Sequence, residues 1–199
     1  MENNFDSNSG IIANTVNGGI HLNIEKRKRI PSLLPKFIEV LTNLYQNSTL
    51  DRETEILNTQ PYTIEEKIDY NDIILYREII EEYYIYYPIC ESSFESLRHI
   101  DENSKKKILT DINEIYRGIK LEYMDQCSKF ENPLEELKKL IRKNADNIIK
   151  KVQDKIKSRI VNSYDGEAFN EQDLVICLNI FVCYALGECK ILERPEKKI

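Results

Sequence analysis

The stretch DLVICLNIFVCYALGECKIL, residues 173–192, decides the fold class of this chain. Its apolar side chains occupy most sides of a helix instead of one stripe, and a helix of that kind is buried. We therefore expect it at the centre of a helical bundle or of an oligomer, with Asn170 as its N-cap. The residues expected in the core are Ile176, Cys177, Leu178, Ile180, Phe181, Cys183, Ala185 and Leu186.

The residues before this helix repeat their apolar positions with the helical period. A first helix follows Pro31, with an apolar face of Leu34, Phe37, Ile38, Leu41, Leu44 and Tyr45. The sequence TIEE, residues 63–66, has the pattern of a capping box and predicts a short helix after Thr63. Two longer helices are predicted at about 104–128 and, after the cap Asn132 and Pro133, at 132–160.

A further helix is expected at about 72–100, capped by Asn71, with Ile73, Ile74, Tyr76, Ile79, Ile80, Tyr83 and Tyr84 on its apolar positions. Pro88 lacks a backbone N–H, so we expect a break or kink near 86–88. The run EEYYIYYPICESSF, residues 81–94, contains Tyr83, Tyr84, Tyr86 and Tyr87. Tyrosine can bury its ring while its hydroxyl stays in contact with water. The run is therefore typical of a partner surface and equally of the edge of a core.

The N-terminal stretch SGIIANTVNGGIHLNI, residues 9–24, differs from the helical remainder. Asn17-Gly18 between alternating runs is typical of a β-hairpin. We expect residues 1–9 to be disordered, 10–24 to form an oligomerisation tag, 25–32 a hinge and 33–199 the helical domain. The predicted fold is mainly α, a bundle of five or six helices with a short N-terminal β-hairpin or oligomerisation strand. The residues expected to assemble the tag are Ile12, Val16, Ile20, Leu22 and Ile24, and the alternative is a hairpin folded back onto its own bundle.

The charge of this 199-residue chain is unevenly distributed around a net −6. Residues 65–102 contain eleven acids and three bases, and residues 138–159 contain nine bases and two acids. The favoured interpretation is that these segments face each other or share a screened surface. The alternative is a nucleic-acid-binding regulator that uses the helix 138–159 and the basic residues 26–29. The sequence has no apolar run long enough for a membrane span and no signal peptide at its start, so we expect a cytoplasmic protein without a membrane partner.

The sequence contains no recognisable catalytic motif. It lacks a glycine-rich phosphate loop, and no two of its five cysteines have the C-x-x-C spacing of a metal or redox site. We therefore expect no enzyme, cofactor or metal. An unrecognised site near Cys90 and His99 is the competing hypothesis, although a nucleophile needs a positioned base.

Two stretches resemble the helical C-terminal domain of bacterial ABC three-component systems. They are YTIEEKIDYNDIILYREIIEEYYIYYPICESSFESL, residues 62–97, and CYALGECKILERP, residues 183–195, with the short motifs IEEKIDYN and CKILE. The resemblance covers roughly residues 60–195. The tag is similar to the short glycine- and asparagine-rich bead that precedes many bacterial conflict proteins.

This resemblance implies a domain that tethers a variable effector to an ATPase machine in defence against phage and other invading DNA. Such domains usually follow an effector domain, whereas about 40 residues separate the tag from the resembling region, too few for a catalytic domain. The expected function is a non-enzymatic oligomeric adaptor subunit of an anti-phage defence complex, which docks to an ATPase or effector partner. The domain supplies no catalytic residue to carry over.

Overall fold

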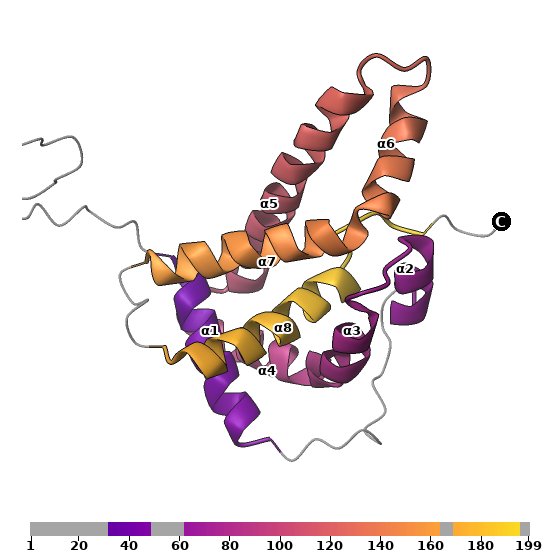
Figure 1. Cartoon of the computed structure of the whole chain (residues 1–199). Helices are drawn as coiled ribbons and strands as arrows, with labels where there is room; N and C mark the ends of the chain where they lie inside the picture. Colours follow the sequence, from indigo (N-terminus) through magenta and orange to yellow (C-terminus); the bar gives the residue numbers. More distant parts are fainter. Residues whose placement is uncertain (1–31, 49–61, 164–168, 196–199) are drawn as a thin grey trace, which may run out of the picture.

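The computed structural model describes residues 32–48, 62–163 and 169–195, and this part of the chain is entirely helical apart from its connections (Figure 1). The elements are α1 (Leu33–Gln46), α2 (Ile64–Tyr70), α3 (Arg77–Tyr83), the 3-10 helix η1 (Tyr84–Tyr86), α4 (Tyr87–Leu97), α5 (Ser104–Cys127), α6 (Pro133–Lys143), α7 (Ala145–Val161) and α8 (Glu171–Gly187). The mainly α class is confirmed. The expected tag residues, from Ile12 to Ile24, and the hinge up to residue 31 lie outside the described residues.

The last helix, α8, is the centre of the bundle, as its composition predicts. It contacts α1, α2, α3, α4 and α7, and every residue from Ile180 to Gly187 is buried. Phe181 packs its ring against Phe37 of α1, with 4.8 Å between the ring centroids. Ile176 is only partly buried. The helix therefore organises a single core, and its few exposed positions lie in its first two turns.

The capping predictions have mixed outcomes. The Asn170 side chain accepts a hydrogen bond from the N–H of Asp173 at 2.8 Å, so this cap is confirmed. The capping box is also confirmed, because Thr63 and Glu66 each accept the other's backbone N–H. The prediction for Asn71 is wrong. Asn71 ends α2, and its side chain bonds to the backbone of Lys67 and Glu193 instead of starting a helix.

Two predicted long helices are each interrupted, so the bundle has more helices than expected. The segment 72–100 contains α3, η1 and α4, and the break falls where Pro88 predicts it, with Pro88 in the first turn of α4. The segment 132–160 turns sharply at Asn144 into α6 and α7, which was not expected. Figure 1 shows α5 and α6 projecting side by side from the bundle, and we call this helical pair the arm.

Residues 188–195 follow α8 as a non-helical segment between α2 and α5, which we call the strap. Glu193 accepts hydrogen bonds from the hydroxyl of Tyr116 and the ammonium of Lys120, both at 2.5 Å. Lys67, which is 2 % exposed, donates to the carbonyl of Gly187 at the end of α8. A cation at that carbonyl end complements the helix dipole. These contacts join the end of α8 and the strap to α2 and α5.

Candidate partner surface

The four tyrosines expected at a partner surface divide into two pairs. Tyr84 and Tyr87 are buried, which matches the alternative interpretation as part of the core. Tyr84 packs on Gly187 so closely that a Cβ there would lie 2.9 Å from its ring, and burial raises the pKa of Tyr84 to about 12. Tyr87 lies 4.6 Å from the ring of Tyr184 and donates its hydroxyl to Glu188. Neither ring is available to a partner.

Tyr83 and Tyr86 remain partly exposed and join Tyr45 from the end of α1. The ring of Tyr86 stands edge-on to Tyr45 at 5.1 Å and lies 6.4 Å from the ring of Tyr83. Burial raises the pKa of Tyr45, and Tyr86 adds to the shift. Partly exposed aromatic rings of this kind are enriched at protein interfaces. This tyrosine cluster is the part of the predicted surface that a partner could still reach.

A second exposed apolar feature was not anticipated. Ile74 and Leu75, in the loop between α2 and α3, are 75 % and 76 % exposed. The sequence pattern predicts that both Ile73 and Ile74 are on the apolar face of a helix. Of these two residues, Ile73 is buried, at 2 % exposure, and Ile74 is not. The composition gave no signal for this exposure, because it depends on a loop that replaces the expected helical turns.

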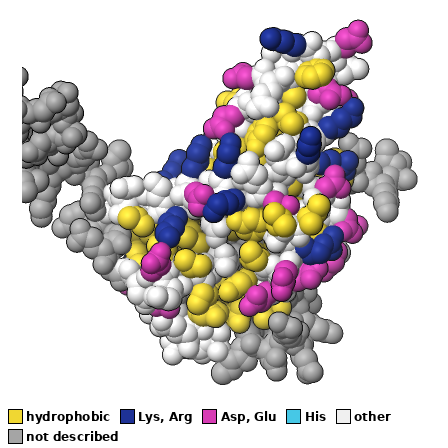
Figure 2. Space-filling model, viewed as in Figure 1, with side chains coloured by type: hydrophobic (Ala, Val, Ile, Leu, Met, Phe, Trp, Pro, Cys, Tyr) yellow, Lys and Arg dark blue, Asp and Glu magenta, His cyan; other side chains and the backbone are white. Residues whose placement is uncertain are grey.

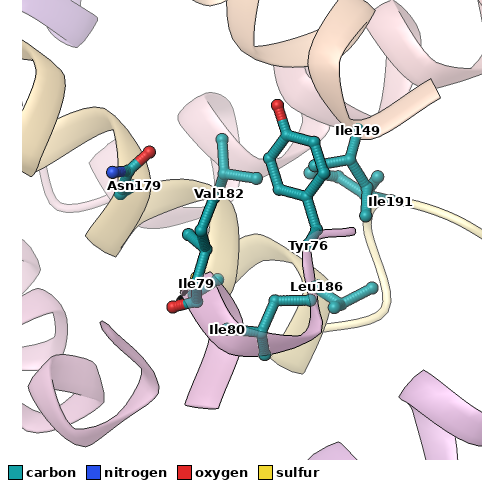
Figure 3. Close-up of a pocket in the computed structure, with 9 residues that line it drawn as sticks. Tyr76, Ile79, Ile80, Ile149, Asn179, Val182, Leu186 and Ile191 are labelled. Atoms are coloured by element: carbon teal, nitrogen blue, oxygen red, sulfur yellow. Dashed lines mark hydrogen bonds between the residues drawn. The ribbon is translucent and has the colours of Figure 1, made fainter. Parts of the chain in front are cut away.

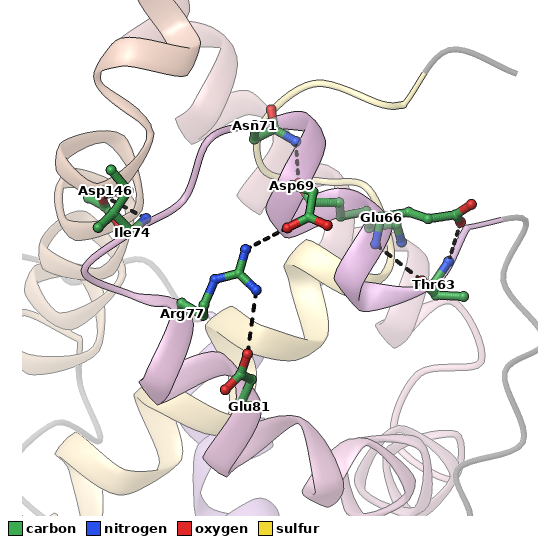
Figure 4. A network of polar contacts seen from close by, with 9 residues as sticks. Thr63, Glu66, Asp69, Asn71, Ile74, Arg77, Glu81 and Asp146 are labelled. Carbon is green, nitrogen blue, oxygen red and sulfur yellow. Dashed lines mark hydrogen bonds and ion pairs between the residues drawn. The ribbon is translucent and has the colours of Figure 1, made fainter. Parts of the chain in front are cut away.

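This loop is held firmly although its apolar side chains face solvent. The carboxylate of Asp146, in the first turn of α7, accepts a hydrogen bond from the N–H of Ile74 at 3.2 Å (Figure 4). It also accepts one from the N–H of Tyr76 at 2.9 Å. The Tyr76 hydroxyl donates to Gln153 further along α7. Ile74 and Leu75 are therefore presented by a backbone that is fixed to the bundle.

Several acidic residues are close to the exposed pair in the sequence. Asp72, Glu78 and Glu82 are exposed, and Arg77 bridges Asp69 and Glu81 on neighbouring helices, at 2.5 Å and 3.6 Å (Figure 4). Figure 2 shows acidic and hydrophobic side chains next to each other on this face. We call Ile74, Leu75 and these acids the acidic apolar patch.

The described residues contain a small cavity and no group of metal ligands. The enclosed cavity between α3, α7 and α8, lined by Tyr76, Val182 and Leu186 among others, has a volume of about 10 Å³ (Figure 3). That volume holds one water molecule at most. Cys90 is fully buried and burial raises its pKa, whereas His99 is exposed. No group of histidine, cysteine and acidic side chains in the described ranges could hold a metal ion.

The basic segment 138–159, which lies in α6 and α7, has most of its charges compensated. The contacts are Lys138–Glu135, Lys139–Glu136, Lys150–Asp154, Lys151–Glu122, Lys155–Glu122, Lys157–Glu171, Arg159–Asp111 and Arg142 over the Tyr70 ring. The bases therefore form their ion pairs within α6 and α7, with α5 and with α8, and, among the described residues, Arg142 contacts the segment 65–102 through the Tyr70 ring. Of the nine bases, Lys143 alone makes no ion pair or ring contact within the described residues.

The family model for C-terminal domain 11 of the ABC-three component (ABC-3C) systems matches residues 29–164. The chain belongs to this family. The match covers more than half of the chain, spans α1 to α7 and ends before α8. It starts earlier than the expected resemblance and includes neither the motif CKILE nor the N-terminal bead. Neither a curated protein nor a solved structure matches the chain.

Membership in an ABC-3C system implies partner subunits, because such a system consists of several components. No helix in the described part of this ABC-3C domain is long and apolar enough to cross a membrane. The described part of the domain offers two apolar surfaces to a partner, the tyrosine cluster and the acidic apolar patch.

Proposed function

We propose that this ABC-3C domain is a non-enzymatic adaptor of an anti-phage defence complex, and that it docks to the ATPase subunit through the acidic apolar patch. The observation that carries the proposal is the exposure of Ile74 and Leu75 on a loop fixed by Asp146. Exposed large aliphatic side chains on a rigid, polar-rimmed surface are typical of interaction sites.

The energetics favour such a docking role. Burying a leucine or isoleucine side chain contributes about 1.5–3 kcal/mol. Because the loop is already ordered, little conformational entropy is lost on binding. Two adjacent residues on this loop can therefore anchor a partner, and the surrounding contacts exclude water from them.

The charge of the patch defines the chemistry of its partner. Asp72, Glu78 and Glu82 are exposed and lie within seven residues of the apolar pair in the sequence, so they add negative charge to this part of the surface. A complementary surface has an apolar pocket with lysine or arginine side chains at its rim. Rim charges of this kind mainly increase the association rate and are screened by salt, so binding should weaken as salt is added.

Co-expression with the ATPase subunit of the same system tests this proposal. The unaltered chain should bind that subunit, and Leu75→Asp should weaken the affinity by about tenfold or more, since it places a charge in an apolar pocket. Leu121→Asp, at a 66 % exposed position of the arm, is the matched control and should bind normally.

Each part of the proposal has its own contrary result. If the unaltered chain does not bind the ATPase subunit, the adaptor role is wrong. If Leu121→Asp weakens binding as much as Leu75→Asp, the acidic apolar patch is not the docking surface. Circular dichroism of both variants should match the unaltered chain, because both positions are exposed.

A further inference from the structure

The first turn of α5 concentrates positive charge where the helix dipole is already positive. This 24-residue helix begins with Ser104 and continues with Lys105, Lys106 and Lys107, and its first turn contains no acid. Partial positive charge at a helix N-terminus favours acidic groups there and disfavours cations. The three lysines of SKKK are therefore repelled by the positive end of the helix dipole. A bound anion would reduce this repulsion.

Part of this charge is neutralised within the fold. Lys105 pairs with Glu91 at 2.8 Å, and Lys107 pairs with Asp101. The hydrogen bonds that Glu91 accepts from Lys105 and Tyr184 outweigh the effect of burial and lower its pKa. Lys106 makes no ion pair with any described residue and is exposed. One lysine of the three thus remains available to an external anion.

Hydrogen-bond donors at this helix end are also unused. The cap residue Asn103 makes no side-chain capping bond, and the N–H groups of Lys105 and Lys106 donate to no acceptor in the described part of the chain. The hydroxyl of Ser104 is buried, with the residue 1 % exposed, and it too has no partner. Buried polar groups are nearly always hydrogen-bonded, so an unpaired one calls for a ligand or another explanation.

Asn103, Ser104, Lys105 and Lys106 help to line one groove of about 380 Å³ between α4, the start of α5 and the strap after α8. Lys190 approaches from the strap and Arg98 from the end of α4, while Phe94 and Leu109 provide apolar wall. The groove also contains four carboxylates. Glu91 and Glu95 pair with Lys105 and Arg98, Glu188 accepts from Tyr87, and Glu102 has no partner among the described residues.

We infer that this groove binds a phosphate group. The Ser104 hydroxyl and the N–H groups of Lys105 and Lys106 donate to its oxygens, and the ammonium groups of Lys106 and Lys190 balance its charge. Helix N-termini bind phosphate by this combination of backbone donors and dipole. The volume exceeds that of a phosphate ion, so the group belongs either to free phosphate or to a small organic phosphate whose remainder lies along Phe94 and Leu109. This site is independent of the proposed docking to the ATPase subunit.

Titration of the full chain with inorganic phosphate, followed by backbone amide NMR shifts, tests the site. With phosphate up to about 10 mM, which detects a millimolar dissociation constant, the amides of Lys105 and Lys106 should shift in a saturable way. Adenosine 5′-monophosphate forms the second arm. Tighter binding than inorganic phosphate identifies an organic phosphate, and equal affinity identifies the free ion.

Four variants separate this site from general charge attraction. Ser104→Ala and Lys106→Gln should each weaken phosphate binding by about tenfold, since each removes a hydrogen bond to a charged group. Glu102→Gln should strengthen it, because it removes the unpaired carboxylate. Lys143→Gln removes an equally exposed lysine at the end of α6 and should leave the affinity unchanged. Absence of saturable shifts at Lys105 and Lys106, or equal weakening by Lys143→Gln, would overturn the inference.

Discussion

Asn71 and Glu193, which are 122 residues apart in the sequence, exchange two hydrogen bonds of 3.0 Å between the Asn71 amide and the Glu193 backbone. Asn71 is fully buried and also donates to the carbonyl of Lys67 at 2.9 Å. The two short motifs that suggested the family from the sequence, IEEKIDYN and CKILE, therefore pack against each other. Their residues hold the strap, and through it α8, against α2.

Replacing Asn71 by alanine should lower the free energy of unfolding by roughly 2–4 kcal/mol, because each buried group that loses its partner costs about 1–3 kcal/mol. Urea denaturation measures this loss. Asn162→Ala is the matched control, since Asn162 also ends a helix and bonds to a carbonyl four residues earlier but is exposed. Similar losses in both variants would show that the contact with Glu193 contributes nothing.

The core prediction concerns Phe181, which is fully buried against Phe37. Phe181→Ala should cost about 3–5 kcal/mol, because it removes a large side chain and leaves a cavity. Thermal or urea unfolding followed by circular dichroism gives the value. Val175→Ala lies on the same helix at a 40 % exposed position and should change stability by less than about 0.5 kcal/mol. A small effect at Phe181 would contradict a single core built around α8.

Local signals in the sequence predicted those parts of the fold that depend on near neighbours. The capping box at Thr63, the cap Asn170 and the break before Pro88 all follow from backbone donors within a few residues. The turn at Asn144 could not be predicted in this way. The apolar positions Ile141, Ala145 and Ile148 keep a helical spacing across it, although α6 packs on α5 and α7 also packs on α8.

The candidate site was harder to predict than the core, because exposure is decided by tertiary contacts. The tyrosine run gave no indication of which rings enter the core. Tyr84 and Tyr87 do so because α8 presents Gly187 and Tyr184 to them. Ile74 is exposed in a loop whose backbone N–H donates a hydrogen bond to Asp146, 72 residues away in the sequence. Neither relationship has a signature in a short stretch of sequence.

Alkaline pH should destabilise the domain through buried acidic protons. Burial raises the pKa of the Cys177 thiol to about 11 and of the Tyr84 hydroxyl to about 12, from ordinary values of 9.0 and 10.0. Above pH 9 the unfolded chain therefore loses these protons first, which favours unfolding. The stabilisation is complete below pH 9 and is lost as the pH rises through 11 to 12.

Urea denaturation at a series of pH values measures this effect. Cys177→Ala should flatten the fall in stability between pH 9 and 11, and Cys189→Ala, at a less buried cysteine, should keep it. An unchanged pH profile for Cys177→Ala would exclude this thiol as a source of the alkaline sensitivity.

Duplex DNA should bind weakly to the basic segment 138–159, because eight of its nine bases already have a partner. Phosphate contacts release counterions, so any residual binding should disappear steeply between about 0.05 and 0.2 M salt. Fluorescence anisotropy with a labelled duplex measures the affinity. Micromolar binding that persists at about 0.2 M salt would favour the nucleic-acid-binding regulator over the adaptor.

The last prediction concerns the N-terminal tag, whose residues Ile12, Val16, Ile20, Leu22 and Ile24 lie outside the described part of the structure. A lone two-stranded hairpin is marginally stable in water, and unpaired strand edges pair readily with further strands. We therefore expect the tag to assemble several chains and to raise the local concentration of their docking surfaces. Deleting residues 1–25 should reduce the mass in solution, measured by light scattering, and leave the helical circular dichroism signal unchanged. An unchanged mass after the deletion would show that the tag does not assemble the protein, and it would favour a hairpin folded onto its own bundle.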